Sequence, residues 1–110
     1  IQAFGISIND HQPDTALEAI RTGLVDAVQV IYNIFDQSPE RDLFPLCQEL
    51  GVGVLARVPL DEGALTGNIT PATTFPEGDF RNRYFGGDRK AQVAERVRAL
   101  QADVPGPLPE

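Results

Sequence analysis

The chain has 110 residues, of which 42% are hydrophobic and 23% are charged, and this length and composition fit one small globular domain. Its 16 acidic and nine basic residues give a net charge of −7, which argues against a nucleic-acid backbone as the main partner. No apolar run approaches the roughly 20 residues that a membrane-spanning helix needs, and residues 1–10 carry no signal-peptide pattern, so we expect no membrane partner.

A single cysteine, Cys47, cannot form a disulfide within the chain, so the sequence predicts a reducing, cytoplasmic location. Its place among the apolar positions of an expected helix favours a small core residue. The chain begins with Ile1 rather than Met, and we expect that the start of the protein lies upstream.

The first expected strand covers residues 3–8, which are short, apolar and β-prone. Pro13 suits the first position of the helix that follows, and Gly23 suits its C-terminal end. His11 lies alone at the start of the intervening loop. We therefore expect it neither to bind a metal nor to take part in catalysis.

The second expected strand covers residues 27–32 and is nearly continuous in apolar character, as parallel strands buried on both faces tend to be. Gln29 interrupts it, and a buried amide must find hydrogen-bond partners, either in neighbouring backbone or in a bound ligand. In the next helix, we expect Ser38 to be the N-cap, Pro45 to kink or split the helix, and Gly51 to end it.

The third expected strand covers residues 52–56 and leads into a loop over 58–87, longer than the roughly 12–15 residues of an ordinary connection. Arg57 stands where this strand ends. A charged side chain and free backbone N–H groups at such a place can hold an anion such as a pyrophosphate. The alternative is an ordinary strand–loop junction with a solvated arginine. A last helix is expected over roughly 88–102.

Several residues of this region have two interpretations. Asp61 and Glu62 form either a catalytic carboxylate pair or a solvated loop, and we expect the solvated loop. A basic cluster either meets a phosphate or forms a surface paired with nearby acids, and we expect the paired surface: Arg81, Arg83, Arg89 and Lys90. Aromatic residues are expected to pack the loop back onto the body: Phe80, Tyr84 and Phe85. Residues 104–110 form a Pro-rich extended segment.

The resulting order is strand, helix, strand, helix, strand, long loop and helix. The strands begin roughly 25 residues apart, which is the repeat of a βα unit. Such units require parallel strands joined by right-handed crossovers. The sequence therefore predicts an α/β fold with three parallel strands, too short for a complete eight-stranded barrel of about 250 residues.

Three segments in this order and spacing resemble the aldo-keto reductases: GISIND at 5–10, VQVIYN at 28–33 and LARVPLDEGALTG at 55–67. The resemblance implies a partial (β/α)8 TIM barrel over residues 1–110, formed by the fifth to seventh βα units. It also implies a nicotinamide-dependent oxidoreductase that reduces aldehydes and ketones. The expected partners are NADP(H) as cofactor and a small carbonyl compound as substrate.

The resemblance also implies cofactor-binding residues. Ser7 and Gln29 match residues that hold the nicotinamide carboxamide. The family commonly has an asparagine directly after the serine, whereas this chain has Asn9 one position further on. Arg57 replaces an aromatic residue, so its guanidinium either lies against the nicotinamide ring or turns to the pyrophosphate. The loop that closes over the pyrophosphate, largely through backbone N–H groups, is matched by Val58, Leu60, Gly63 and Leu65.

No catalytic residue is assigned to this chain. The family's catalytic Asp, Tyr, Lys and usual His come from the first four strands, and neither Tyr32, Tyr84, Lys90 nor His11 matches them. The expected function is therefore a part of the cofactor site of a reductase, without its acid–base group. The alternative is a non-catalytic α/β module that self-associates or pairs with a complementary half-barrel, because open strand edges invite pairing.

Overall fold

The computed structural model describes residues 1–106. Its contacts divide the chain into two compact units, Ile1–Pro59 and a second that begins at Leu60. In the predicted Pro-rich segment, Val104 has an extended backbone, and residues 107–110 lie outside the described residues.

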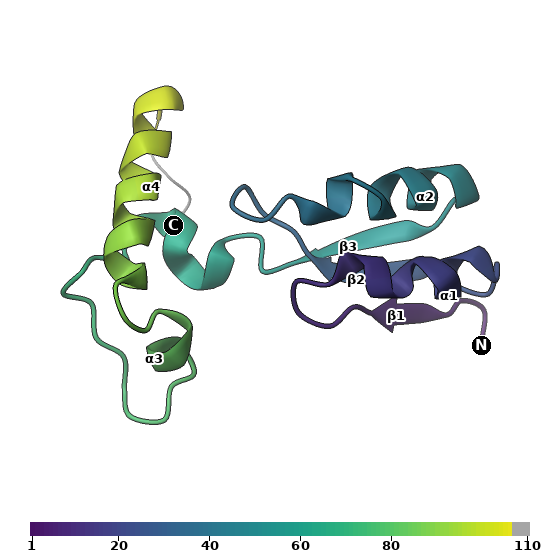
Figure 1. Cartoon of the computed structure of the whole chain (residues 1–110), viewed down its shortest axis with the longest axis horizontal. Helices are drawn as coiled ribbons and strands as arrows, with labels where there is room; N and C mark the ends of the chain where they lie inside the picture. The colour runs from purple at the N-terminus through teal and green to yellow at the C-terminus, as the bar shows by residue number, and fades with distance from the viewer. Residues whose placement is uncertain (107–110) are drawn as a thin grey trace. The chain divides into compact units, whose positions relative to one another are not determined.

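The first unit is built on a sheet of three parallel strands in the order β1 (Gly5–Ser7), β2 (Ala27–Ile31) and β3 (Gly53–Arg57) (Figure 1). The predicted α/β class and the parallel direction of the strands are confirmed. β1 is shorter than the predicted strand, and β3 extends to include Arg57.

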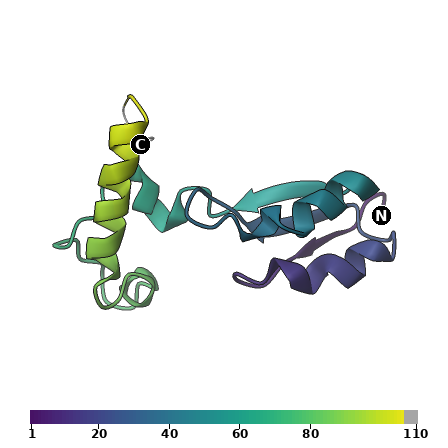
Figure 2. The ribbon, with the colours of Figure 1, turned by 45° about the horizontal axis from the view of Figure 1, so that its top comes forward.

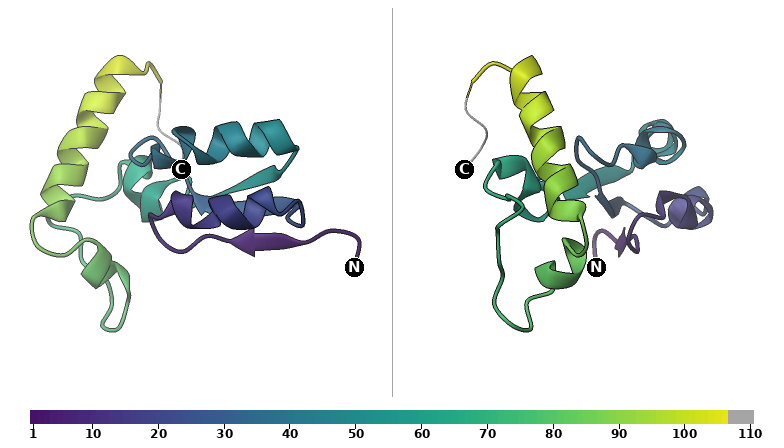
Figure 3. Two further views of the ribbon diagram at one scale, coloured as in Figure 1. Left: turned by 45° about the vertical axis from the view of Figure 1, so that its right-hand side comes forward. Right: turned by 60° about the vertical axis from the view of Figure 1, so that its left-hand side comes forward.

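Each strand-to-strand connection of the sheet contains a 3-10 turn and a short helix. The first has η1 (Pro13–Ala16) and α1 (Leu17–Arg21), and the second has η2 (Ser38–Glu40) and α2 (Leu43–Leu50). Both helices lie on the same side of the sheet (Figure 3). Their apolar faces and that side of the strands form the core, which consists of Ile8, Ala16, Ile20, Val25, Val28, Val30, Leu43, Cys47 and Val52.

The second helical region differs from its prediction. Ser38 is not a side-chain cap: it begins η2, and its hydroxyl donates to the Asp36 carboxylate instead. Pro45 falls in the first turn of α2, where its missing N–H would have no carbonyl to reach within the helix. The expected split therefore lies earlier, between η2 and α2. Gly51 ends α2 with a φ of 68°, as predicted.

The second unit contains η3 (Asp61–Thr66), α3 (Arg81–Tyr84) and α4 (Arg89–Asp103) (Figure 2). The predicted long loop over 58–87 is therefore wrong in part, because it contains η3 and α3; short elements without an apolar period leave no pattern to recognise. The last helix is confirmed. The buried apolar residues of this unit are Ala64, Leu65, Ile69, Phe85, Val93 and Val97.

Candidate functional site

One face of the sheet carries the residues predicted to bind the nicotinamide. Ser7 pairs with Gln29 in the β1–β2 register, and Gln29 pairs with Leu55 in the β2–β3 register. Because side chains alternate along a strand, these three side chains share the face opposite the helices, which we call the open face. They line a cavity of about 240 Å³ together with the small residues Gly5 and Ala27.

The predicted burial of Gln29 is wrong, because its side chain is exposed. Its strand neighbours Val28 and Val30 point to the helix-covered face and are buried. Within the first unit, neither α1 nor α2 covers the open face, so the Gln29 amide is accessible to a ligand. Asn9 lies beyond the end of β1 and is also exposed.

Arg57 is the last residue of β3 and pairs with Ile31 of β2. It lies two positions after Leu55, so it belongs to the open face, at the carboxyl end of the strands. Its guanidinium Nε is the one buried side-chain polar atom without a hydrogen-bond partner among the residues that the structure describes. A buried donor without a partner is costly, and a bound anion or polar group would satisfy it.

Val58 follows in an unusual conformation, with a φ of 58°. A β-branched residue rarely adopts this left-handed region, because its side chain clashes with the backbone there. The backbone carbonyls of Arg57 and Val58 accept hydrogen bonds from the two residues that follow β2. The Tyr32 N–H donates to the Arg57 carbonyl over 3.1 Å, and the Asn33 side-chain amide donates to the Val58 carbonyl over 3.0 Å.

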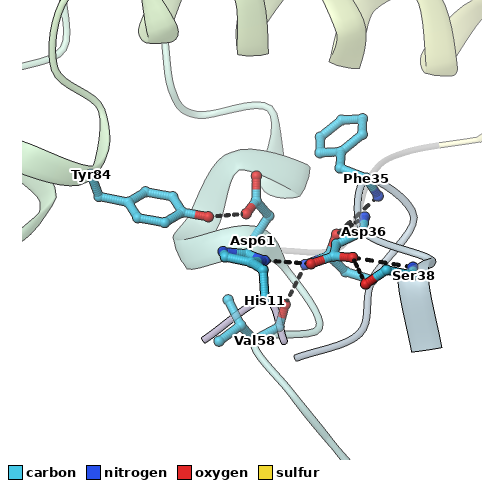
Figure 4. Close-up of polar contacts among 8 residues, drawn as sticks. His11, Phe35, Asp36, Ser38, Val58, Asp61 and Tyr84 are labelled. Carbon is cyan, nitrogen blue, oxygen red and sulfur yellow. Dashed lines mark hydrogen bonds and ion pairs between the residues drawn. The ribbon is translucent and has the colours of Figure 1, made fainter. Parts of the chain in front are cut away.

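The turn at residues 33–38, which we call the β2 turn, also reaches the loop after β1 (Figure 4). The imidazole Nδ1 of His11 is hydrogen-bonded to the Asp36 carboxylate. The other oxygen of that carboxylate accepts from the N–H and the hydroxyl of Ser38, over 3.2 and 2.7 Å. Burial tends to raise the pKa of Asp36, but the hydrogen bonds from His11 and Ser38 together lower it below its ordinary value.

The sequence does not reveal these contacts. His11 is expected to be an isolated loop residue, yet it has a carboxylate partner 25 positions away. Asn33 belongs to the VQVIYN segment, but nothing in its spacing indicates a role. The spacing of Asp36 and Ser38 ahead of Pro39 is a recognisable local turn signal, because a carboxylate can accept from the backbone two residues on.

The loop predicted to close over a pyrophosphate forms a tight turn in the second unit. Positive φ angles of 49° and 56° occur at Asp61 and Glu62, followed by one of 95° at Gly63. The N–H groups of Gly63 and Leu65 both donate to the Leu60 carbonyl over 3.1 Å. Two of the backbone donors that the sequence suggests for a ligand are thus engaged in the turn itself.

The expectation that Asp61 lies in a solvated loop is wrong. Its side chain is buried, with 5% of the residue exposed, and it accepts a hydrogen bond from the Tyr84 hydroxyl (Figure 4). Burial and the neighbouring Asp61 carboxylate raise the pKa of Tyr84 to about 12. The hydrogen bond between Tyr84 and Asp61 joins the end of α3 to η3. It therefore holds η3 in place within the second unit.

In the basic cluster, the predicted pairing with an acid is confirmed for Arg81. Its guanidinium lies 2.7 Å from the Asp79 carboxylate, and this contact lowers the pKa of Asp79 to about 2. Arg89 lies over the Tyr84 ring at 4.5 Å, and Lys90 donates to the Thr73 carbonyl over 2.7 Å. The contacts of Arg81, Arg89 and Lys90 are all made within the second unit.

Neither a metal centre nor a membrane span emerges from residues 1–106. No group of three or more His, Cys, Asp or Glu side chains in this range could hold a metal ion. No helix in the same range is both long and apolar enough to cross a bilayer. Cys47 is buried, and burial raises the pKa of its thiol, as expected for a core residue.

Residues 1–106 match the model of the aldo/keto reductase family. Three curated relatives are similar in sequence. A probable aldo-keto reductase 1 of Glycine max is 32% identical over 99 residues, covering 86% of this chain and 29% of the relative. An aldo-keto reductase yakc [NADP(+)] of Schizosaccharomyces pombe is 33% identical over 81 residues, covering 71% of this chain and 24% of the relative. An NADH-specific methylglyoxal reductase of Escherichia coli is 39% identical over 70 residues, covering 64% of this chain and 21% of the relative.

The fold of the chain also matches a solved structure of a glycerol dehydrogenase from Gluconobacter oxydans. The TM-score is 0.70 with 26% sequence identity, and the match covers 98% of this chain but 34% of the dehydrogenase. The chain thus spans about a third of that structure and less of the curated relatives. Its three parallel strands correspond to part of the family's TIM barrel. On this evidence, the chain belongs to the aldo/keto reductase family.

Proposed function

We propose that this chain forms part of the nicotinamide and pyrophosphate site of an NADP(H)-dependent reductase that acts on aldehydes and ketones. The observation that supports this most directly is the pairing of Ser7 with Gln29 across β1 and β2 on the open face. The family match adds the reaction class. Residues 1–110 would then be the fifth to seventh βα units of the barrel, in a cytoplasmic enzyme.

The polar groups of the open face suit a nicotinamide carboxamide. The Ser7 hydroxyl and the Gln29 amide can each donate and accept, so together they can satisfy both ends of a carboxamide. This would fix which face of the nicotinamide ring meets the substrate. When bound, the cofactor supplies the hydride that is transferred to the carbonyl carbon. Asn9, at the exit of β1, is a further candidate for this site.

The pyrophosphate part of the proposal depends on Arg57, whose buried Nε lacks a partner. Its planar guanidinium would either lie against the nicotinamide ring or donate to the pyrophosphate. Val58 begins the loop, and in the second unit the candidates are Leu60, Gly63 and Leu65. Because the Gly63 and Leu65 N–H groups bond the Leu60 carbonyl, a pyrophosphate would have to replace those contacts. The proton donor for the reaction is not assigned to this chain.

The names of the relatives mention both nicotinamide cofactors, NAD(H) and NADP(H). One is described as using NADP(+), and another is described as NADH-specific. The proposal for NADP(H) is tested by measuring the dissociation constants of NADPH and NADH for the whole protein that carries this chain. Tighter binding of NADH would overturn the NADP(H) preference and leave the remainder of the proposal intact.

Replacement of Gln29 by alanine is expected to weaken cofactor binding. The loss of about 1–2 kcal/mol of hydrogen bonding corresponds to an increase in the dissociation constant of about 5- to 30-fold. The measurement is a fluorescence titration of NADPH with the whole protein. Gln48→Ala, which truncates an exposed glutamine on α2, is the matched control and should leave the constant unchanged. An unchanged constant in Gln29→Ala would mean that the amide does not contact the cofactor.

A second candidate function is a non-catalytic module that self-associates or pairs with a complementary half-barrel. The observation in its favour is the apolar surface of β3, where Val54 is 40% exposed and Leu55 is 60% exposed. β1 and β3 are also edge strands, with hydrogen-bonding groups available to another chain.

Under this second candidate, the mass of the 110-residue chain in sedimentation velocity should rise with concentration. Leu55→Glu places a charge on the open face and should return the chain to a monomer. A monomeric mass at all concentrations would exclude self-association. A cofactor response that is abolished by Gln29→Ala would instead support the reductase proposal.

A further inference from the structure

Asn33 is a buried polar residue at the exit of β2, with 7% of the residue exposed. Its side chain makes three hydrogen bonds. The amide Nδ2 donates to the Val58 carbonyl over 3.0 Å, and Oδ1 accepts from the N–H groups of Phe35 and Asp36 over 2.9 and 3.1 Å. The acceptor bonds shape the β2 turn, and the donor bond joins that turn to the chain after β3.

The donor bond falls on a strained residue, Val58. Val58 has a φ of 58°, which a β-branched side chain adopts only when its surroundings enforce it. The preceding carbonyl, that of Arg57, accepts from the Tyr32 N–H over 3.1 Å. The carbonyls of Arg57 and Val58 are therefore held by Tyr32 and Asn33, the two residues that follow β2, which fixes the backbone of the first unit directly after β3.

We propose that Asn33 is a positioning residue for cofactor binding, because it holds Val58 in the left-handed conformation that orients the Arg57 guanidinium. This inference rests on the proposed function, in which Arg57 contacts the nicotinamide or the pyrophosphate. The buried Nε of Arg57 supports it, since a donor held in place without a protein partner is suited to a ligand. Asn33 itself need not touch the cofactor.

The first test is Asn33→Asp in the whole protein, with NADPH binding followed by fluorescence. A carboxylate can still accept from the Phe35 and Asp36 N–H groups, but it cannot donate to the Val58 carbonyl. The dissociation constant should rise about tenfold, the equivalent of one such hydrogen bond. Asn82→Asp is the matched control, because the Asn82 amide also donates to a backbone carbonyl, that of Pro76, over 2.8 Å in the second unit. The dissociation constant of NADPH should stay unchanged in this control variant.

The second test separates positioning from a general role in folding. Glycine adopts positive φ without strain, so Val58→Gly makes the turn less dependent on the Asn33 amide. Asn33→Asp should therefore weaken binding by only about threefold in the Val58→Gly background, compared with about tenfold in the Val58 background. Circular dichroism of each variant establishes that it is folded at the assay temperature. If Asn33→Asp does not fold, Asn33→Ser removes the amide that reaches the Val58 carbonyl, while the shorter side chain keeps a hydroxyl that can accept from the β2 turn.

The outcomes separate this inference from the function on which it rests. If Gln29→Ala weakens binding and Asn33→Asp does not, the positioning role is wrong and the cofactor site stands. If Asn33→Asp weakens binding equally with valine and with glycine at position 58, the residue does not act through the turn, and the inference is overturned. If neither Gln29→Ala nor Asn33→Asp changes the constant, the proposed function itself fails.

Discussion

Phe85→Ala should destabilise the second unit by about 3–5 kcal/mol, because it removes the centre of that unit's core. Phe85 has 0% exposure and is the largest fully buried side chain of the described residues. Its ring stacks on Phe75 with centroids 5.8 Å apart and meets the edge of Tyr84 at 4.9 Å. Truncation removes these contacts and leaves a cavity that the surrounding residues can fill only in part.

The measurement is urea unfolding followed by circular dichroism. Phe80→Ala is the matched control, because Phe80 lies five positions earlier on the same segment and is 55% exposed. Its truncation should cost no more than about 0.5 kcal/mol, as at other surface positions. If Phe80→Ala and Phe85→Ala shift the unfolding midpoint equally, Phe85 is not the centre of this core.

Tyr84→Phe should cost about 2 kcal/mol, although it removes one oxygen atom. The Tyr84 hydroxyl donates to the buried Asp61 carboxylate, and the variant leaves that carboxylate without this donor. The loss of a partner from a buried charged group costs more than the loss of an exposed hydrogen bond. Because the pair holds η3, the same variant should also loosen the loop proposed to lie near the pyrophosphate.

The pH dependence of stability provides an independent measurement on the same pair. The pKa of Tyr84 is raised in the folded chain from its ordinary value of 10.0 to about 12. The stability contributed by the neutral hydroxyl is therefore fully present below pH 10 and is lost as the pH rises from 10 towards 12. Tyr84→Phe should show a shallower loss over this interval.

Tyr32→Phe is the control for that pH profile. The Tyr32 hydroxyl donates to the Glu40 carboxylate over 2.6 Å, and this bond raises the pKa of Tyr32 as well, but the contact is exposed. We expect the larger change of slope in Tyr84→Phe, because the carboxylate beside Tyr84 is the buried one. Parallel profiles for the wild type and Tyr84→Phe would contradict a specific bond between Tyr84 and Asp61.

The architecture of the sheet could be predicted because its signals are local. The apolar runs around Val28 and Val54 mark strands, and their spacing requires parallel pairing. Pro13 begins the first helical turn and Gly51 ends α2, since each residue is restricted or permitted in the backbone conformation found there. Which residues share the open face follows from the alternation of side chains along each strand.

Two side-chain contacts could not be predicted, because they join residues far apart in the sequence. Asn33 meets Val58 across 25 positions, and Tyr84 meets Asp61 across 23. Neither pair has a spacing that a helix or strand would impose. The exposure of Gln29 could not be predicted for another reason: a nearly continuous apolar strand suggests burial on both faces, whereas α1 and α2 cover only one.

A crystal structure of the whole protein with its bound nicotinamide cofactor tests the central claim most directly. The proposal predicts that the carboxamide lies within about 3 Å of both the Ser7 hydroxyl and the Gln29 amide, the distance of a hydrogen bond. It also predicts that the Arg57 guanidinium contacts the ring or the pyrophosphate. A carboxamide bound away from β1 and β2, with Ser7 and Gln29 both facing solvent, would contradict the account.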